Sequence, residues 1–204
     1  LGWSPKDNRE LFSLQELTEA FSVSGISKSP AIFDYDKLLW MNGEYIKGMS
    51  PEEFTRRAAP YYADVFGVDA KDTEVLRLVL QARITKFSDI PELVGFLKEL
   101  PPYDRELFIN KKSKTTLENS PQMLEAAIGE LENVTDWTLE SIHDSLIALA
   151  GRLEVKNGTL LWPVRIAAAG KTVTPGGAME ILQLLGREEA LRRLRIGLEK
   201  LSTE

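Results

Sequence analysis

The spacing of the apolar residues constrains the fold of this chain more than any other feature. Across residues 135–153 they recur at intervals of three and four, as at Leu139, Ile142, Leu146, Leu149 and Leu153. This is the period of one face of an α-helix. The alternation of apolar and polar residues that is typical of a half-buried strand is nearly absent from the chain. The sequence therefore predicts an all-α fold.

Potential helix caps and helix breakers divide the chain into helical segments. Ser13 with Glu16 forms a capping-box pattern, and Ser50 precedes Pro51 and Glu53 in a second helix start. Asn157 and Gly158 predict a turn, and Gly186 predicts a helix end. The predicted helices are 13–21, 34–46, one opening at each of Ser50, Asp72, Ser88, Ser120 and Thr135, a short one at 104–110, and those at 159–169, 177–185 and 187–201.

Pro101-Pro102-Tyr103 interrupts the helical pattern near the middle of the chain. Two prolines stop a helix, and no repeat of fixed period relates the two sides. We therefore expect a hinge here and two consecutive helical subdomains, residues 1–104 and 105–204.

Composition excludes several classes of protein. With 204 residues, 43% of them hydrophobic, the chain can bury a core. It has no cysteine, which excludes disulfides and thiolate metal sites and fits the cytoplasm. No apolar run approaches the roughly 20 residues that cross a bilayer, so we expect no membrane partner. The chain begins without Met, at what resembles a turn, and we interpret it as a fragment of a longer polypeptide and as a monomer.

The net charge of −6 argues at first against a nucleic-acid partner. The charge is unevenly distributed, however. Residues 115–151 contain seven acidic residues and no Lys or Arg, whereas residues 152–200 contain nine basic residues and five acidic ones. A locally basic face near the C-terminus is therefore possible.

Catalytic signals are weak. The single histidine, His143, lies in a predicted amphipathic helix and has no cysteine or second histidine with which to form a metal site or a nucleophilic dyad. Paired carboxylates such as Glu52 and Glu53 fit the starts of helices, where the helix dipole favours negative charge. We expect no catalytic residue, metal site or cofactor in this chain.

Residues 111–115, Lys-Lys-Ser-Lys-Thr, match the loop that holds ATP phosphates in class I aminoacyl-tRNA synthetases. That loop works beside a nucleotide-binding parallel sheet, and this chain has no βαβ pattern. We interpret Lys111 to Lys114 as a solvated basic turn, with a patch that contacts the RNA backbone as the alternative.

Arg165 interrupts an otherwise apolar run, and a loop of small and hydroxyl-bearing residues follows it at 171–177. The backbone amides of such a loop and the forked guanidinium suit the edges of single-stranded RNA bases. A structural loop, with Arg165 paired to a carboxylate, is the other interpretation.

Three separated stretches resemble glutamyl-tRNA synthetases, in order and along essentially the whole chain. They are residues 1–5, residues 27–34 with 37–46, and residues 162–170 with 174–182. The resemblance implies that this chain is the anticodon-binding C-terminal portion of a class I aminoacyl-tRNA synthetase and that its partner is tRNA(Glu). It also implies a catalytic part, absent here, that attaches glutamate to tRNA with ATP and Mg.

The resemblance also implies roles for individual residues. Arg165 and the loop Thr174-Pro175-Gly176-Gly177 match the positions that read the second and third anticodon bases. Gly177 stands where relatives often carry a bulky residue, and it offers no side chain for an apolar base contact.

A weaker similarity places Arg83 at the position that selects C over U at the first anticodon base. A surface arginine paired with an acid is an equal alternative for Arg83. Lys37, Asn42 and Lys47 are expected to face the tRNA stem, although Asn42-Gly43 could also form a turn between helices.

A second hypothesis from another class is a helical protein–protein interaction module without RNA binding. The acidic segment at 115–151 and the many amphipathic helices motivate it. It predicts a discrete exposed apolar patch.

Overall fold

The computed structural model describes residues 2–5, 7–29, 32–67 and 72–202, and this part of the chain contains α-helices, short 3-10 helices and two isolated β-bridges. The predicted all-α class is confirmed. Leu1, Pro30 and Ala31, which belong to the stretches of family resemblance, lie outside the described residues. The α-helices are α1 (Leu14–Ala20), α2 (Tyr35–Lys47), α3 (Pro51–Phe66), α4 (Thr73–Leu80), α5 (Ile90–Lys98), α6 (Ser120–Leu131), α7 (Leu139–Arg152), α8 (Asn157–Ala169), α9 (Ala178–Leu185) and α10 (Arg187–Ser202).

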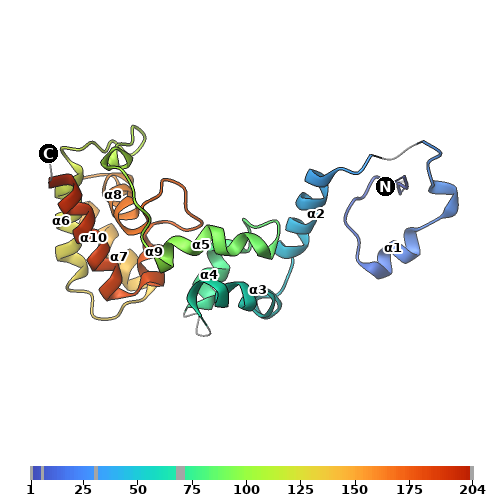
Figure 1. The fold of residues 1–204 in the computed structure, drawn as a ribbon, viewed down its shortest axis with the longest axis horizontal. Helices are drawn as coiled ribbons and strands as arrows, with labels where there is room; N and C mark the ends of the chain where they lie inside the picture. Colours follow the sequence, from blue (N-terminus) through green and yellow to red (C-terminus); the bar gives the residue numbers. More distant parts are fainter. Residues whose placement is uncertain (1, 6, 30–31, 68–71, 203–204) are drawn as a thin grey trace.

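The molecule is elongated, with three parts in chain order (Figure 1). An open N-terminal segment carries α1 and leads into α2. Helices α3, α4 and α5 form the middle part, and α6 to α10 pack together at the opposite end. No described helix is long and apolar enough to span a membrane.

The local capping signals located several helix starts correctly. Ser13 and Glu16 form the expected capping box, and the side chain of Ser50 accepts a hydrogen bond from the amide of Glu53. Pro51 is the first residue of α3, where its missing N–H costs no hydrogen bond.

Three predicted helix boundaries were wrong, and one predicted short helix is of the 3-10 type. Ser88 caps no helix, because a 3-10 turn (Phe87–Asp89) runs directly into α5. Thr138 rather than Thr135 caps α7, and the predicted turn at Asn157 is instead the first residue of α8. The expected helix at 104–110 is only a short 3-10 helix (Arg105–Phe108). Thr135 and Thr138 both carry a hydroxyl that can cap a helix, so the local sequence did not distinguish them.

The middle and C-terminal parts meet through α9, which contacts α4 and α5. At this junction Gly176 packs against Val79 of α4: a Cβ atom on Gly176 would lie 3.0 Å from Val79 Cγ1. Gly176 therefore allows the loop before α9 to approach α4 closely.

Arg193 of α10 makes a second connection and is fully buried. Its guanidinium donates to the carbonyls of Phe96 and Leu97 in the last turn of α5, at 2.7 and 3.0 Å, and to that of Ala168 in the last turn of α8, at 3.0 Å. The last carbonyls of a helix lack partners within the helix, so one side chain satisfies two helix ends. The predicted boundary at 104/105 lies close to this junction, and that division into two domains stays a prediction.

Candidate nucleic-acid interface

A cleft of about 270 Å³ lies between α5 and the loop that joins α8 to α9. In Figure 1 this loop extends from the C-terminal part toward α5. The residues that line the cleft are Arg83, Glu92, Leu93, Lys171, Val173, Thr174 and Pro175. The fold thus brings Arg83 next to Thr174 and Pro175, although these predicted site residues are far apart in the sequence.

Arg83 is exposed in the turn after α4. One of its guanidinium nitrogens, Nη1, donates to the carbonyl of Val79 at 2.9 Å. No ion pair of Arg83 is found among the described residues, which leaves the alternative of a surface arginine paired with an acid without support. The backbone contact holds the side chain at the edge of the cleft, with further N–H donors available.

Arg165 lies on α8, outside the lining of this cleft but against the same loop. Its Nη2 donates to the carbonyl of Thr172 at 2.9 Å, and its guanidinium carbon lies 4.6 Å from the centre of the Trp162 ring. Burial lowers the pKa of Arg165 from its ordinary value, although the group stays charged at any physiological pH. The side chain is thus positioned by an aromatic face and a backbone carbonyl rather than by the carboxylate that the structural interpretation required.

The loop residues divide into two groups. Pro175 and Gly176 are buried, and Gly176 contributes to the junction with α4. The Thr174 hydroxyl is half-buried and donates to the carbonyl of Gly176 at 2.6 Å, while its oxygen keeps acceptor capacity. Gly177 is exposed, and its amide donates to Glu180 at 3.0 Å. The loop is therefore held by its own hydrogen bonds, with Thr174 facing the cleft.

The three residues expected to face the tRNA stem have partners within the chain. Lys37 is ion-paired with Glu10, and Lys47 is paired with Glu44 at 2.6 Å. Asn42 donates to the carbonyl of Thr85 at 2.5 Å and so connects α2 to the turn after α4. Asn42 and Gly43 lie inside α2, which excludes the alternative of a turn at these residues.

The basic turn at 111–114 lies on the surface, as both of its interpretations require. Its lysines are exposed, whereas Thr115 is only 2% exposed and donates to the carbonyl of Phe108 at 2.7 Å. The Ser113 carbonyl accepts a hydrogen bond from Thr159 at the start of α8. The hydroxyl of Thr115 is thus committed to the fold, whereas the exposed lysines keep their N–H donors, so contact with an RNA backbone stays a prediction.

The single histidine has an acidic neighbour in the structure. His143 is exposed on α7 beside Asp144, with 3.0 Å between Nδ1 and Oδ1. Across the described residues, no cluster of three or more His, Asp or Glu side chains could hold a metal ion.

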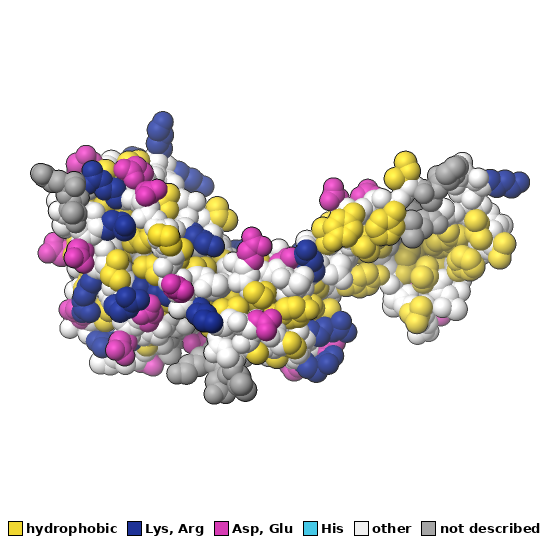
Figure 2. All heavy atoms as spheres, viewed as in Figure 1, with side chains coloured by type: hydrophobic (Ala, Val, Ile, Leu, Met, Phe, Trp, Pro, Cys, Tyr) yellow, Lys and Arg dark blue, Asp and Glu magenta, His cyan; other side chains and the backbone are white. Residues whose placement is uncertain are grey.

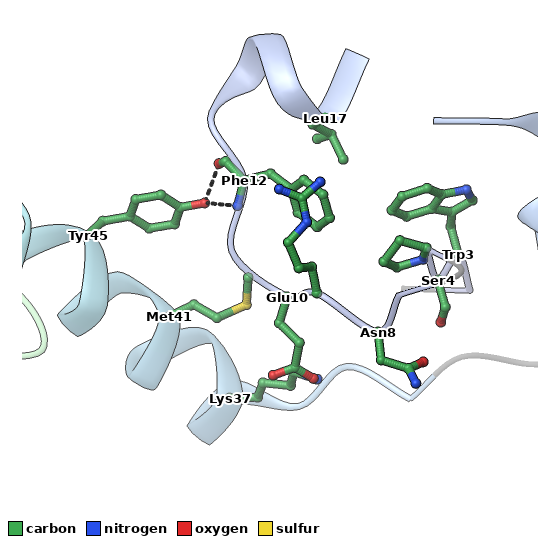
Figure 3. Close-up of a pocket in the computed structure, with 11 residues that line it drawn as sticks. Trp3, Ser4, Asn8, Glu10, Phe12, Leu17, Lys37, Met41 and Tyr45 are labelled. Carbon is green, nitrogen blue, oxygen red and sulfur yellow. Dashed lines mark hydrogen bonds and ion pairs between the residues drawn. The ribbon is translucent and has the colours of Figure 1, made fainter. Parts of the chain in front are cut away.

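The N-terminal segment contains a pocket of about 530 Å³ that the sequence did not predict. In Figure 3 the Tyr45 side chain of α2 reaches the backbone of Phe12, while Lys37 and Glu10 close another side. The Tyr45 hydroxyl donates to the carbonyl of Phe12 at 2.6 Å and accepts from its amide at 3.2 Å. These contacts attach the open segment to α2.

Large exposed apolar side chains occur over the same region. Figure 2 shows hydrophobic side chains gathered over α2 and the N-terminal segment. The exposed ones include Leu14, Phe21, Val23, Ile26, Ile32, Phe33, Tyr35, Leu38, Trp40 and Tyr45. An exposed patch is the feature that the protein-interaction hypothesis predicted, and it lies away from the cleft.

Glu92, Lys171 and Val173 also line the cleft and were not predicted as site residues. Lys171 and Val173 belong to the predicted loop at 171–177, so their position in the sequence could have indicated them. Glu92 carries no such signal, because only the packing of α5 beside the loop places it there.

Comparison with known proteins gives two kinds of match. The sequence model of the "Anticodon binding domain" family matches residues 53–198. Curated glutamate–tRNA ligases of Clostridium tetani and Clostridium novyi are 50% and 49% identical over 100% and 98% of this chain. The chain spans 42% of the length of each of these relatives.

Solved structures of similar fold include a glutamate tRNA ligase of Elizabethkingia meningosepticum, with a TM-score of 0.80 over 98% of this chain and 39% of that one. The glutamate-tRNA synthetase of Elizabethkingia anophelis gives 0.81 over 98% of this chain and 38% of that one. Both are 24% identical and establish the fold alone. The family match covers most of the chain, including the cleft, Arg165 and the loop. The chain therefore belongs to the anticodon-binding domain family.

Proposed function

We propose that this chain binds tRNA(Glu) and recognises its anticodon through the cleft, Arg165 and the loop at 171–177. The observation that carries the proposal is the convergence of Arg83, Lys171 and Thr174 on one cleft inside the matched family region. Splayed single-stranded bases are bound by cations, by apolar surface and by hydroxyl and backbone groups. The cleft offers all of these. We name tRNA(Glu) because the curated relatives are glutamate–tRNA ligases.

The parts of the site have different roles in this proposal. Arg165 and Thr174 contact the second and third anticodon bases, Arg83 contacts the first, and Pro175 and Gly176 support the loop from within. Gly177 offers only its backbone carbonyl, because its amide already donates to Glu180. Lys37, Asn42 and Lys47 approach the stem only if the tRNA competes for their present partners.

The proposal extends to the longer protein that the relatives indicate. We infer that this chain acts as a monomeric, non-catalytic part of a cytoplasmic glutamate–tRNA ligase. ATP and Mg then belong to a separate catalytic part, and aminoacylation by this chain alone should not exceed background.

A binding titration tests the proposal. The chain is titrated with tRNA(Glu) transcripts that carry single changes at each anticodon position, over a series of salt concentrations. We expect affinity to fall with salt, because phosphate contacts release counterions, and to fall when the second or third base is changed. An affinity that falls with salt but is the same for all transcripts would mean that the chain contacts only the RNA backbone. An absence of binding would favour the protein-interaction module.

The decisive variant is Arg165→Ala. A forked contact between arginine and a base is worth about 1–3 kcal/mol, so affinity for tRNA(Glu) should fall by that amount. Arg152→Ala is the matched control, because Arg152 pairs with Glu130 on the surface and lines neither the cleft nor the loop. Equal affinity of the two folded variants would remove Arg165 from the interface.

A further inference from the structure

Glu92 gives the cleft a charge pattern that backbone binding does not explain. It is the one carboxylate among the lining residues, where Arg83 and Lys171 supply the positive charge. A carboxylate repels the phosphates that cations attract, so it weakens an RNA cleft unless it contacts something other than phosphate.

The side chain of Glu92 is free to act as an acceptor. It is exposed near the start of α5, and no hydrogen bond or ion pair of Glu92 is found among the described residues. An ionised carboxylate only accepts hydrogen bonds, whereas a guanidinium only donates them. Arg83 uses Nη1 on the carbonyl of Val79, which leaves its other N–H groups for a ligand.

The cleft therefore presents an acceptor and a donor together, which suits one class of base edge. Cytosine and adenine carry an exocyclic amino donor beside an unprotonated ring nitrogen that accepts. Uracil and guanine carry a carbonyl oxygen beside a ring N–H, which is the reverse pattern. Leu93 and Val173, the latter 83% exposed, add apolar contact for the face of the ring.

We propose that Glu92 is a specificity-determining residue that accepts a hydrogen bond from the exocyclic amino group of cytosine or adenine, while Arg83 donates to the adjacent ring nitrogen. This inference rests on the proposed function and assigns the chemical class of the base that enters the cleft. It predicts selection against uracil and guanine at one anticodon position. Lys171, which also lines the cleft, is left for a phosphate.

The test compares Glu92→Gln with wild type in binding to anticodon stem-loop hairpins that carry each of the four bases at each anticodon position. Glutamine keeps the size of the side chain but can also donate, so it tolerates the carbonyl of uracil. At one position wild type should bind C or A about tenfold more tightly than U. In Glu92→Gln that preference should fall to about twofold or less. Preferences at the other two positions should stay as in wild type.

Glu99→Gln is the matched control. Glu99 is the residue that follows α5 and lies outside the lining of this cleft, and its substitution removes the same charge. If Glu99→Gln lowers the preference as much as Glu92→Gln does, general charge rather than base reading explains the effect, and the inference fails.

The remaining outcomes separate this inference from the proposed function. If wild type discriminates among the hairpins and Glu92→Gln shows the same base preferences at every position, Glu92 contacts no base. In that case only the inference fails. If wild type binds none of the hairpins, both fail. Glu92→Gln that binds uracil hairpins more tightly than wild type does, with its other preferences intact, supports the inference directly.

Discussion

The guanidinium of Arg193 makes four hydrogen bonds in the described structure. Besides three carbonyls it contacts Glu189, with 2.6 Å between Nε and Oε1. A buried charge is tolerated only when its hydrogen bonds are satisfied. Arg193 meets this condition by using the electronegative C-terminal ends of α5 and α8.

Arg193→Met should therefore destabilise the fold strongly. The variant leaves three buried carbonyls without a donor, so the free energy of unfolding should fall by roughly 3 kcal/mol or more. Urea denaturation followed by circular dichroism measures the change. Arg192→Met is the control, because Arg192 contacts the same Glu189 from an exposed position, and it should lose no more than about 1 kcal/mol. Similar losses in both variants would show that burial of Arg193 has no special importance.

Glu189 gives the fold a pH dependence. Hydrogen bonds from Arg192 and Arg193 lower its pKa from 4.5 to about 2. A carboxyl group with a lowered pKa in the folded state stabilises the fold above its unfolded pKa, and this stabilisation is lost as the pH falls through the folded value. Glu189→Gln lacks this contribution. The difference in Tm between wild type and Glu189→Gln should be constant near neutral pH and shrink from about pH 4.5 toward 2. A difference that does not change with pH would contradict the assignment.

Helices α8 and α10 approach each other closely at Gly197. A Cβ atom on Gly197 would lie 2.5 Å from the Cβ of Ala167. Ala167 belongs to the run Ala167-Ala168-Ala169, which is fully buried. Small residues on both helices thus set the distance between them, and this distance positions α8, which carries Arg165, relative to α10, which carries Arg193.

Gly197→Ala should test this packing. The added methyl group forces the helices apart and should cost about 1–3 kcal/mol of stability. Gly151→Ala on α7 is the matched control, because a Cβ atom there meets nothing within 4 Å. It should be neutral or stabilise by up to about 1 kcal/mol, since alanine favours helix. Thermal unfolding distinguishes the two, and a neutral Gly197→Ala would show that α8 and α10 can separate freely.

At the scale of the whole molecule, the chain is an elongated series of parts rather than one sphere (Figure 1). A compact domain of this length has a radius of gyration of about 17 Å. Small-angle X-ray scattering of this chain should give a clearly larger value. A radius near 17 Å would mean that the N-terminal segment folds back onto the helical parts in solution.

The elongated arrangement also separates two surfaces. The cleft lies at the junction of the middle and C-terminal parts, whereas the exposed apolar side chains lie on α2 and the N-terminal segment. The family match begins at residue 53 and leaves the apolar patch outside it. The cleft of the proposed function and the apolar surface therefore belong to different regions of the chain.

The sequence alone determined the all-α class and most helices, because helix formation depends on local spacing and capping. Ser13 and Ser50 act within one turn of their helices, so their roles could be predicted. Arg165, Thr174 and Arg83 were predicted as site residues from motif resemblance, and their roles in binding stay predictions. The start of α7 was misplaced at Thr135 because Thr138, three residues later, offers the same capping hydroxyl.

Only the tertiary structure decided which distant residues meet. Arg193 resembles any other charged residue of α10 in the sequence, yet it is buried against the ends of α5 and α8. Glu92 resembles an ordinary acidic residue in the first turn of a helix, yet it faces the loop that contains Thr174. The physical reason is that helical periodicity specifies which face of a helix is apolar but not which helix covers it. That choice depends on the volumes of small residues such as Gly176 and Gly197 at contacts that are distant in sequence.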